Sequence, residues 1–113
     1  MDIKFSDIDL EELINTGYNK KYKKYSRDKK FMDGLARVYK IMQVVPDAEG
    51  LGHYSFLHYE KLANNVYLSS VRPVNGRVER ILFKEIDGGI EILIIELNDD
   101  HYGNKKWSYG ADG

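Results

Sequence analysis

Apolar residues recur at helical spacing in the first half of the chain. After a short alternating stretch at residues 3–5, which predicts a first strand, an apolar stripe begins at Leu10 and reaches Tyr25. Its members are Leu10, Leu13, Ile14, Gly17, Tyr18, Tyr22 and Tyr25. Asp9 followed three residues later by Glu12 is typical of a capping box, so we expect a first helix to begin there.

A second helix is predicted between Asp28 and Pro46. Asp28 can cap its N-terminus, and apolar residues follow at helical spacing. These residues are Phe31, Leu35, Val38, Tyr39 and Met42. Pro46 should end the helix because its ring disfavours helical geometry in the preceding residue. Two helices joined by only a few residues predict an antiparallel pair packed on a sheet.

The second half of the chain changes to the patterns of strands and turns. Residues 68–71 predict a strand, and the Asn-Gly pair at 75–76 predicts a hairpin turn. Residues 78–85 alternate between the two faces of a further strand. After a second turn at 87–89, residues 90–97 are rich in isoleucine, which is typical of a central strand covered on both faces.

These patterns predict an α+β fold in the order β-α-α-β-β-β, with two N-terminal helices packed on a mostly antiparallel sheet. We expect a single domain over residues 1–104 and a flexible C-terminal tail at 105–113. The chain of 113 residues contains no cysteine, which excludes disulfide bonds and thiolate chemistry. Its start does not resemble a signal peptide, and its longest apolar run is too short to cross a membrane. The expected location is the cytoplasm, without a membrane partner.

The net charge of −1 conceals a strongly basic segment. Between Tyr18 and Lys40, nine basic residues stand against two acidic ones, which gives this segment a charge of +7. The basic residues are Lys20, Lys21, Lys23, Lys24, Arg27, Lys29, Lys30, Arg37 and Lys40. Such a density of positive charge attracts polyanions through counterion release. From charge alone, a solvated helix face is an equally good interpretation.

One short segment, at residues 57–61, combines an imidazole, a phenol and an ammonium group. His58 is suited to proton transfer because the ordinary pKa of histidine is about 6.5. Lys61 and Arg80 are suited to binding phosphate, and Tyr102 could donate a hydrogen bond to it. These groups fit a nuclease that binds phosphate and moves protons without a metal ion. Each also has a structural interpretation, as a surface histidine, a solvated strand-edge cation or a tyrosine that seals the sheet.

These residues, in this order, resemble the RelE/ParE superfamily of bacterial toxins, most closely its HigB-like branch. Leu57-His58-Tyr59-Glu60-Lys61-Leu62 resembles the Leu-His-x-x-Lys segment of that branch. Ser70-Val71-Arg72 and Arg80-Ile81-Leu82-Phe83 resemble its Ser-(Ile/Val)-Arg and Arg-(Ile/Leu)-x-Phe strands. Asp100-His101-Tyr102 resembles its C-terminal His-Tyr end. The likeness covers residues 1–104.

The resemblance implies a RelE-like, microbial-ribonuclease-like fold and a toxin of a type II toxin–antitoxin module. Such a toxin is a metal-independent endoribonuclease, or mRNA interferase, which binds the ribosome, cleaves the translated mRNA and arrests growth. It needs no cofactor and is neutralised by a cognate antitoxin. Carried over by motif, the catalytic residues are His58, Lys61, Arg80 and Tyr102. The expected RNA and ribosome contacts are Arg72, Arg77, Lys20, Lys21, Lys23, Lys24, Arg27, Lys29 and Lys30.

Two other functions stay open at this point. A ParE-like toxin inhibits DNA gyrase by binding and needs no hydrolytic residues, although the His58 and Tyr102 motifs argue against this branch. A catalytically inactive relative would act only as a binding or regulatory partner.

Overall fold

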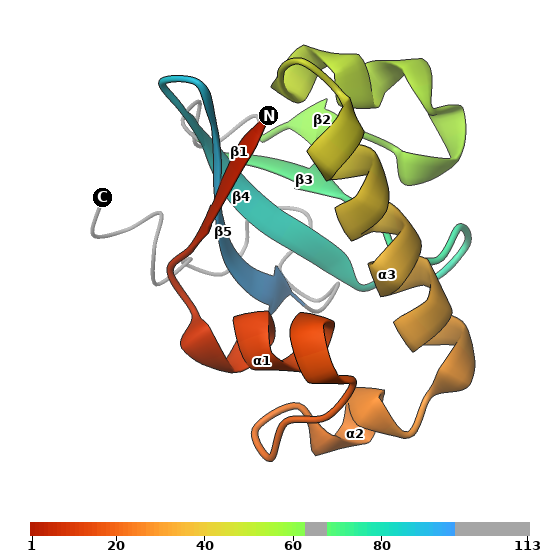
Figure 1. Cartoon of the computed structure of the whole chain (residues 1–113). Coiled ribbons are helices and arrows are strands. Elements are labelled where there is room, and N and C mark those ends of the chain that lie inside the picture. The colour runs from red at the N-terminus through yellow and green to blue at the C-terminus, as the bar shows by residue number, and fades with distance from the viewer. Residues whose placement is uncertain (63–67, 97–113) are drawn as a thin grey trace.

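Within the residues that the structure describes, 1–62 and 68–96, five strands form one mixed sheet in the order β1-β5-β4-β3-β2 (Figure 1). In this computed structural model the strands are β1 (Asp2–Phe5), β2 (Glu60–Lys61), β3 (Leu68–Val71), β4 (Arg80–Ile86) and β5 (Gly89–Glu96). β1 runs parallel to β5, and the other neighbours are antiparallel. The chain is therefore an α+β domain, as its sequence pattern predicts.

Helical elements occupy the chain between β1 and β2 (Figure 1). They are α1 (Ile8–Thr16), α2 (Lys23–Ser26), α3 (Lys29–Val44) and the 3-10 helices η1 (Ala48–His53) and η2 (Ser55–Leu57). Of these, α1 and α3 pack against one face of the sheet (Figure 1). α3 matches its prediction closely. Asp28 accepts a hydrogen bond from the N–H of Phe31 at 3.1 Å, and the backbone becomes extended at Val45, just before Pro46.

The prediction that Asp9 caps the first helix was wrong. The cap is Asp7, whose carboxylate accepts hydrogen bonds from the N–H groups of Asp9 and Leu10 at 2.9 and 3.3 Å. A capping residue needs an extended backbone, which Asp7 has, whereas Asp9 already lies within the first helical turn.

The apolar stripe that reaches Tyr25 does not lie on one helix, because α1 ends at Thr16. Gly17 adopts a left-handed conformation (φ 84°), and its N–H bonds the carbonyl of Leu13. Tyr22 and Tyr25 are buried all the same, from the turn before α2 and from α2 itself. The spacing that predicted one long helix therefore identified buried tyrosines correctly, although they do not lie on the same helix as Leu10 and Leu13.

The strand pattern is mostly as predicted, with additions that sequence periodicity did not indicate. β2 has only two residues and was not predicted. β4 begins at Arg80 rather than at residue 78, so residues 72–79 form a longer connection than the predicted hairpin. A bulge between Leu82 and Phe83 shifts the register between β4 and β5.

The described residues form apolar clusters on the two faces of the sheet. The larger cluster joins α1 and α3 to Ile81, Phe83 and Ile92 of β4 and β5. The smaller cluster consists of Leu62, Leu68, Leu82 and Leu93. It lies on the opposite face of the sheet, because Leu82 stands between Ile81 and Phe83 on β4 and successive side chains of a strand point to opposite faces. No helix in the described ranges is long and apolar enough to cross a membrane. The predicted domain end at residue 104 and the tail at 105–113 lie outside the described residues.

Candidate functional site at the strand ends and the α3 groove

The ends of three adjacent strands bring several candidate residues to one end of the sheet. β2 begins at residue 60, β3 ends at 71, and β4 begins at 80. The strands are antiparallel, with Glu60 paired to Ser70 and Ser70 paired to Leu82. Just beyond the paired residues, the N–H of Arg72 donates to the carbonyl oxygen of Leu57 at 2.7 Å. The segment that carries His58, the end of β3 and the start of β4 therefore lie together.

His58 has an unusual backbone conformation. Among the described residues it is the only one other than glycine with a positive φ (φ 51°, ψ 47°), and it follows the last residue of η2. For a residue with a Cβ this conformation costs about 1–2 kcal/mol. Backbone strain held in place by its surroundings is common at functional sites.

The imidazole of His58 is exposed and held from one side. Its Nε2 lies 2.6 Å from Oδ1 of Asn75, in the connection between β3 and β4. An amide oxygen can only accept, so this contact places a proton on Nε2. In the neutral ring, Nδ1 is then the nitrogen that can accept a proton.

Arg80 lies on the face of the sheet opposite the helices. It is 1% exposed, and its Nη1 is 3.3 Å from Oε1 of Glu60 on β2. Leu82, two residues along β4, belongs to the apolar cluster on this face. The low dielectric around such a buried cation strengthens its attraction to the Glu60 carboxylate.

Lys61 lies on the other face. It pairs with Ser69, which pairs with Phe83 in the helix-facing core. Its Nζ is 3.9 Å from Oε2 of Glu85, an oxygen that also accepts hydrogen bonds from Tyr59 and Ser69. Burial and the hydrogen bond to Glu85 raise the pKa of Tyr59 to about 12. The structure therefore brings His58 and Arg80 to one end of the sheet but places Lys61 in a separate polar cluster.

Arg77 braces the start of α3. Its guanidinium contacts Asp28 and Glu79, each through a 2.7 Å ion pair, and lies 5.6 Å from the ring centroid of Phe31. Hydrogen bonds from the Phe31 N–H and from Arg77 lower the pKa of Asp28. Burial alone would raise the pKa of Glu79, but the hydrogen bonds with Arg77 and the backbone lower it. In the same connection, the guanidinium of Arg72 donates to the carbonyl oxygen of Arg77 at 2.8 Å.

The basic residues predicted to contact RNA are exposed around α2 and the start of α3. They are Lys20, Lys21, Lys23, Lys24, Arg27, Lys29 and Lys30. Lys21 pairs with Asp7 at 3.1 Å and Lys29 with Asp33 at 2.9 Å.

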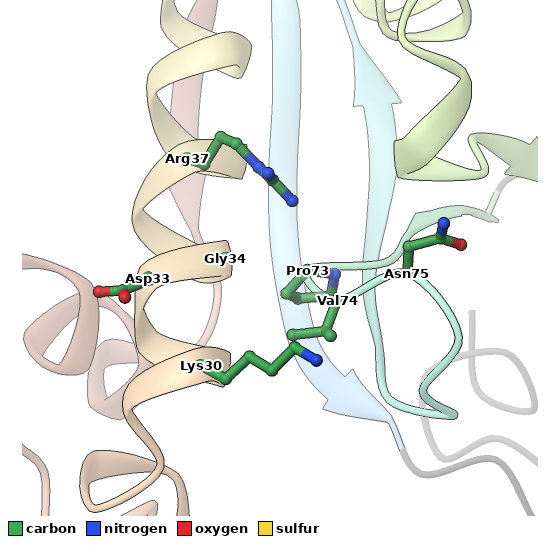
Figure 2. Close-up of a pocket in the computed structure, with 7 residues that line it drawn as sticks. All are labelled: Lys30, Asp33, Gly34, Arg37, Pro73, Val74 and Asn75. Atoms are coloured by element: carbon green, nitrogen blue, oxygen red, sulfur yellow. The ribbon is translucent and has the colours of Figure 1, made fainter.

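A groove of about 450 Å³ lies along the junction of α3 with the connection between β3 and β4 (Figure 2). It is lined by Lys30, Asp33, Gly34, Arg37, Pro73, Val74 and Asn75. The side chains of Lys30 and Arg37 reach from α3 toward this connection, whereas the carboxylate of Asp33 points away (Figure 2). At Gly34 the two segments touch, because a Cβ there would lie 2.1 Å from the carbonyl oxygen of Pro73.

Sequence reasoning did not assign Arg37 or Asn75 to the site. A signal for Arg37 was present, because it lies two helical turns after Lys30 and so on the same face. Asn75 was interpreted only as a turn residue, and its contact with His58 spans 17 positions of the chain. No local pattern reveals such a contact.

His101 and the predicted catalytic Tyr102 lie outside the described residues. In the described ranges, no group of three or more histidine, aspartate or glutamate residues is arranged to hold a metal ion. No protein-family model matches this sequence, and no curated protein matches it either.

Proposed function

We propose that this chain is the toxin of a type II toxin–antitoxin module, a metal-independent endoribonuclease that cleaves mRNA on the ribosome. The observation that carries the proposal is the position of His58. A strained backbone and Asn75 hold its imidazole at the strand ends that also carry Arg72 and Arg80. His58, Arg72 and Arg80 belong to the motifs that resemble the HigB-like branch. The groove beside α3, which Lys30 and Arg37 line, also includes Asn75, the residue that contacts His58.

The proposed reaction uses the substrate's own 2′-hydroxyl as the nucleophile. Nδ1 of His58 accepts its proton, the 2′-oxygen bonds to phosphorus, and the bond from phosphorus to the 5′-oxygen breaks. The leaving 5′-oxygen takes up a proton from water, His58 returns its proton to solvent, and the products are a cyclic phosphate and a 5′-hydroxyl. Arg72 and Arg80 provide positive charge where negative charge develops on the phosphoryl oxygens.

Lys61 enters this proposal as a supporting residue rather than a phosphate ligand. Its ammonium lies near the carboxylate of Glu85, on the face of the sheet opposite Arg80. An exposed ion pair of this kind contributes little energy, so its loss should affect cleavage less than the loss of Arg80.

Primer extension on a message translated in a cell-free system tests the proposal. The wild-type chain should produce cuts that require translation, and His58→Asn should abolish them. Asparagine is the matched replacement because it tolerates the left-handed backbone better than most residues while removing the imidazole. Absence of translation-dependent cuts with the wild-type chain would refute the proposed activity. Arrest of DNA replication without such cuts would favour the ParE-like alternative, and a harmless chain would favour the inactive relative.

The proposal includes a cognate antitoxin as partner. Acidic and apolar side chains that cover the exposed basic residues would exclude RNA through charge complementarity. Co-expression from the native operon, followed by purification through a tag on this chain, should recover a tightly bound second protein. Recovery of the chain alone would contradict this part of the proposal.

A further inference from the structure

We propose that the groove between α3 and the β3–β4 connection binds backbone phosphates of single-stranded RNA beside the cleaved bond. This inference rests on the proposed function and deepens it, because it assigns substrate contacts to Arg37 and Asn75 and a defined position to Lys30. The expected ligand is the phosphodiester backbone rather than any particular base.

Two cations give the groove its charge. Lys30 and Arg37 are seven residues apart, which places them on one face of α3 and about 10.5 Å apart along its axis. Neither has an ion pair within the described part of the chain. Asp33 also lines the groove, but its carboxylate points away from it and pairs with Lys29 at 2.9 Å (Figure 2). The interior of the groove is therefore positive.

The groove is formed by contacts that keep its walls in place. The guanidinium carbon of Arg37 lies 4.6 Å from the ring centroid of Phe56, a cation–π contact that restricts the side chain. The close approach of Gly34 to the backbone of Pro73 fixes the distance between α3 and the connection. Val74 is buried and forms part of the apolar lining. A ligand thus meets positioned donors, which lowers the entropy lost on binding.

Asn75 joins the groove to the candidate proton-transfer residue. Its Oδ1 contacts Nε2 of His58, and its amide nitrogen makes no hydrogen bond to the described residues. That nitrogen can donate to a phosphate oxygen. An RNA strand lying along the groove would therefore reach His58 at the end formed by Asn75.

The lining favours RNA over an acidic protein segment. Protein interfaces depend on an apolar and aromatic centre surrounded by polar residues. The large apolar side chains exposed in the described ranges are Ile8, Tyr18, Val44 and Val78. None of these lines the groove. Two cations spaced along the groove, with only a small apolar lining between them, are instead suited to binding the phosphates of a polyanion backbone.

Salt-dependent binding to a short RNA tests the inference without requiring cleavage. A fluorescent oligonucleotide with 2′-O-methyl groups lacks the attacking hydroxyl, so the full wild-type chain can be used. Each phosphate contact with a single strand contributes about 0.7 to the slope of log K against log salt concentration. The double variant Lys30→Gln/Arg37→Gln should bind more weakly, with a slope reduced by about 1.4. Lys4→Gln/Lys40→Gln is the matched control, because it removes two exposed charges that lie outside the groove.

The possible outcomes separate this inference from the proposed function. If the double variant keeps the wild-type slope while the wild-type chain cleaves translated mRNA, the groove inference is wrong and the proposed function stands. If the double variant loses RNA binding but the wild-type chain cleaves nothing, the groove binds RNA and the proposed activity is wrong. Unchanged RNA binding together with lost antitoxin binding would make the groove a protein site and overturn the inference. Equal thermal midpoints for the three proteins confirm that folding is unaffected.

Discussion

Replacing Gly34 with alanine should push α3 away from the β3–β4 connection. The new Cβ would lie 2.1 Å from the carbonyl oxygen of Pro73 and 2.8 Å from its carbonyl carbon. Ordinary carbon–oxygen contacts are about 3.3–3.6 Å, so the helix or the connection must move by roughly 1 Å. Both clashing atoms belong to the backbone, and no side-chain rotation can relieve them.

Two opposing terms set the size of this effect. Alanine favours the helix by about 1 kcal/mol relative to glycine, while overpacking typically costs about 1–3 kcal/mol and occasionally more. Because a backbone clash belongs at the upper end, we expect a net loss of about 2 kcal/mol in the free energy of unfolding. For a chain of this size, the melting temperature should fall by roughly 6–12 °C.

Urea and thermal unfolding followed by circular dichroism measure this change. Gly52→Ala is the matched control, because the nearest atom to its Cβ would be a ring carbon of Tyr59 at an ordinary 3.6 Å. The control should stay within about 0.5 kcal/mol of the parent. A Gly34→Ala chain as stable as the parent, or more stable, would refute the inferred contact between α3 and the connection.

Three further predictions concern His58, the Arg77 brace and the division of cations between the two faces. In urea unfolding, His58→Gly should lower the free energy of unfolding far less than His58→Val, because a β-branched side chain is strongly disfavoured at positive φ. Equal losses for the two variants would contradict the strained backbone at His58. The lowered pKa of Glu79 stabilises the folded chain above the ordinary carboxyl pKa of about 4, and this stability is lost as the pH falls through the folded-state pKa. Arg77→Gln should therefore flatten the acid limb of a plot of stability against pH, and an unchanged limb would argue against the brace. In the primer-extension assay, Arg80→Lys should reduce cleavage by about 10²–10³-fold and Lys61→Gln by less than about 10-fold, and the reverse order would contradict the assigned roles.

Helix α3 shows what local signals can establish. Asp28 as a cap and Pro46 as a stop act within one turn of the backbone, and the apolar period between them needs no tertiary information. The first helix was less predictable, because Tyr22 and Tyr25 have helical spacing yet reach the core from a turn and a separate short helix. A side chain is buried because of where it lies in space, and a helix or a turn can bring it to the same place.

The candidate site illustrates the same limit more sharply. Sequence motifs selected His58, Lys61 and Arg80 but could not say which of them share a face. That division depends on register: Lys61 pairs with Ser69 toward the helix-facing core, while Arg80 lies beside Glu60 on the other face. A shift of one residue would exchange every side chain between the faces, and a two-residue strand carries no pattern that specifies its register.

The sequence by itself determined the α+β class, the long helix, the main strands and the basic character of residues 18–40, because these follow from periodicity, caps and charge over short distances. Only the tertiary structure decided that Asn75 holds His58 and that Lys30 and Arg37 face the same connection. The contact at Gly34 brings that connection against α3, nearly 40 positions earlier in the chain. Such contacts arise from packing between distant segments, and no short stretch of sequence contains both partners.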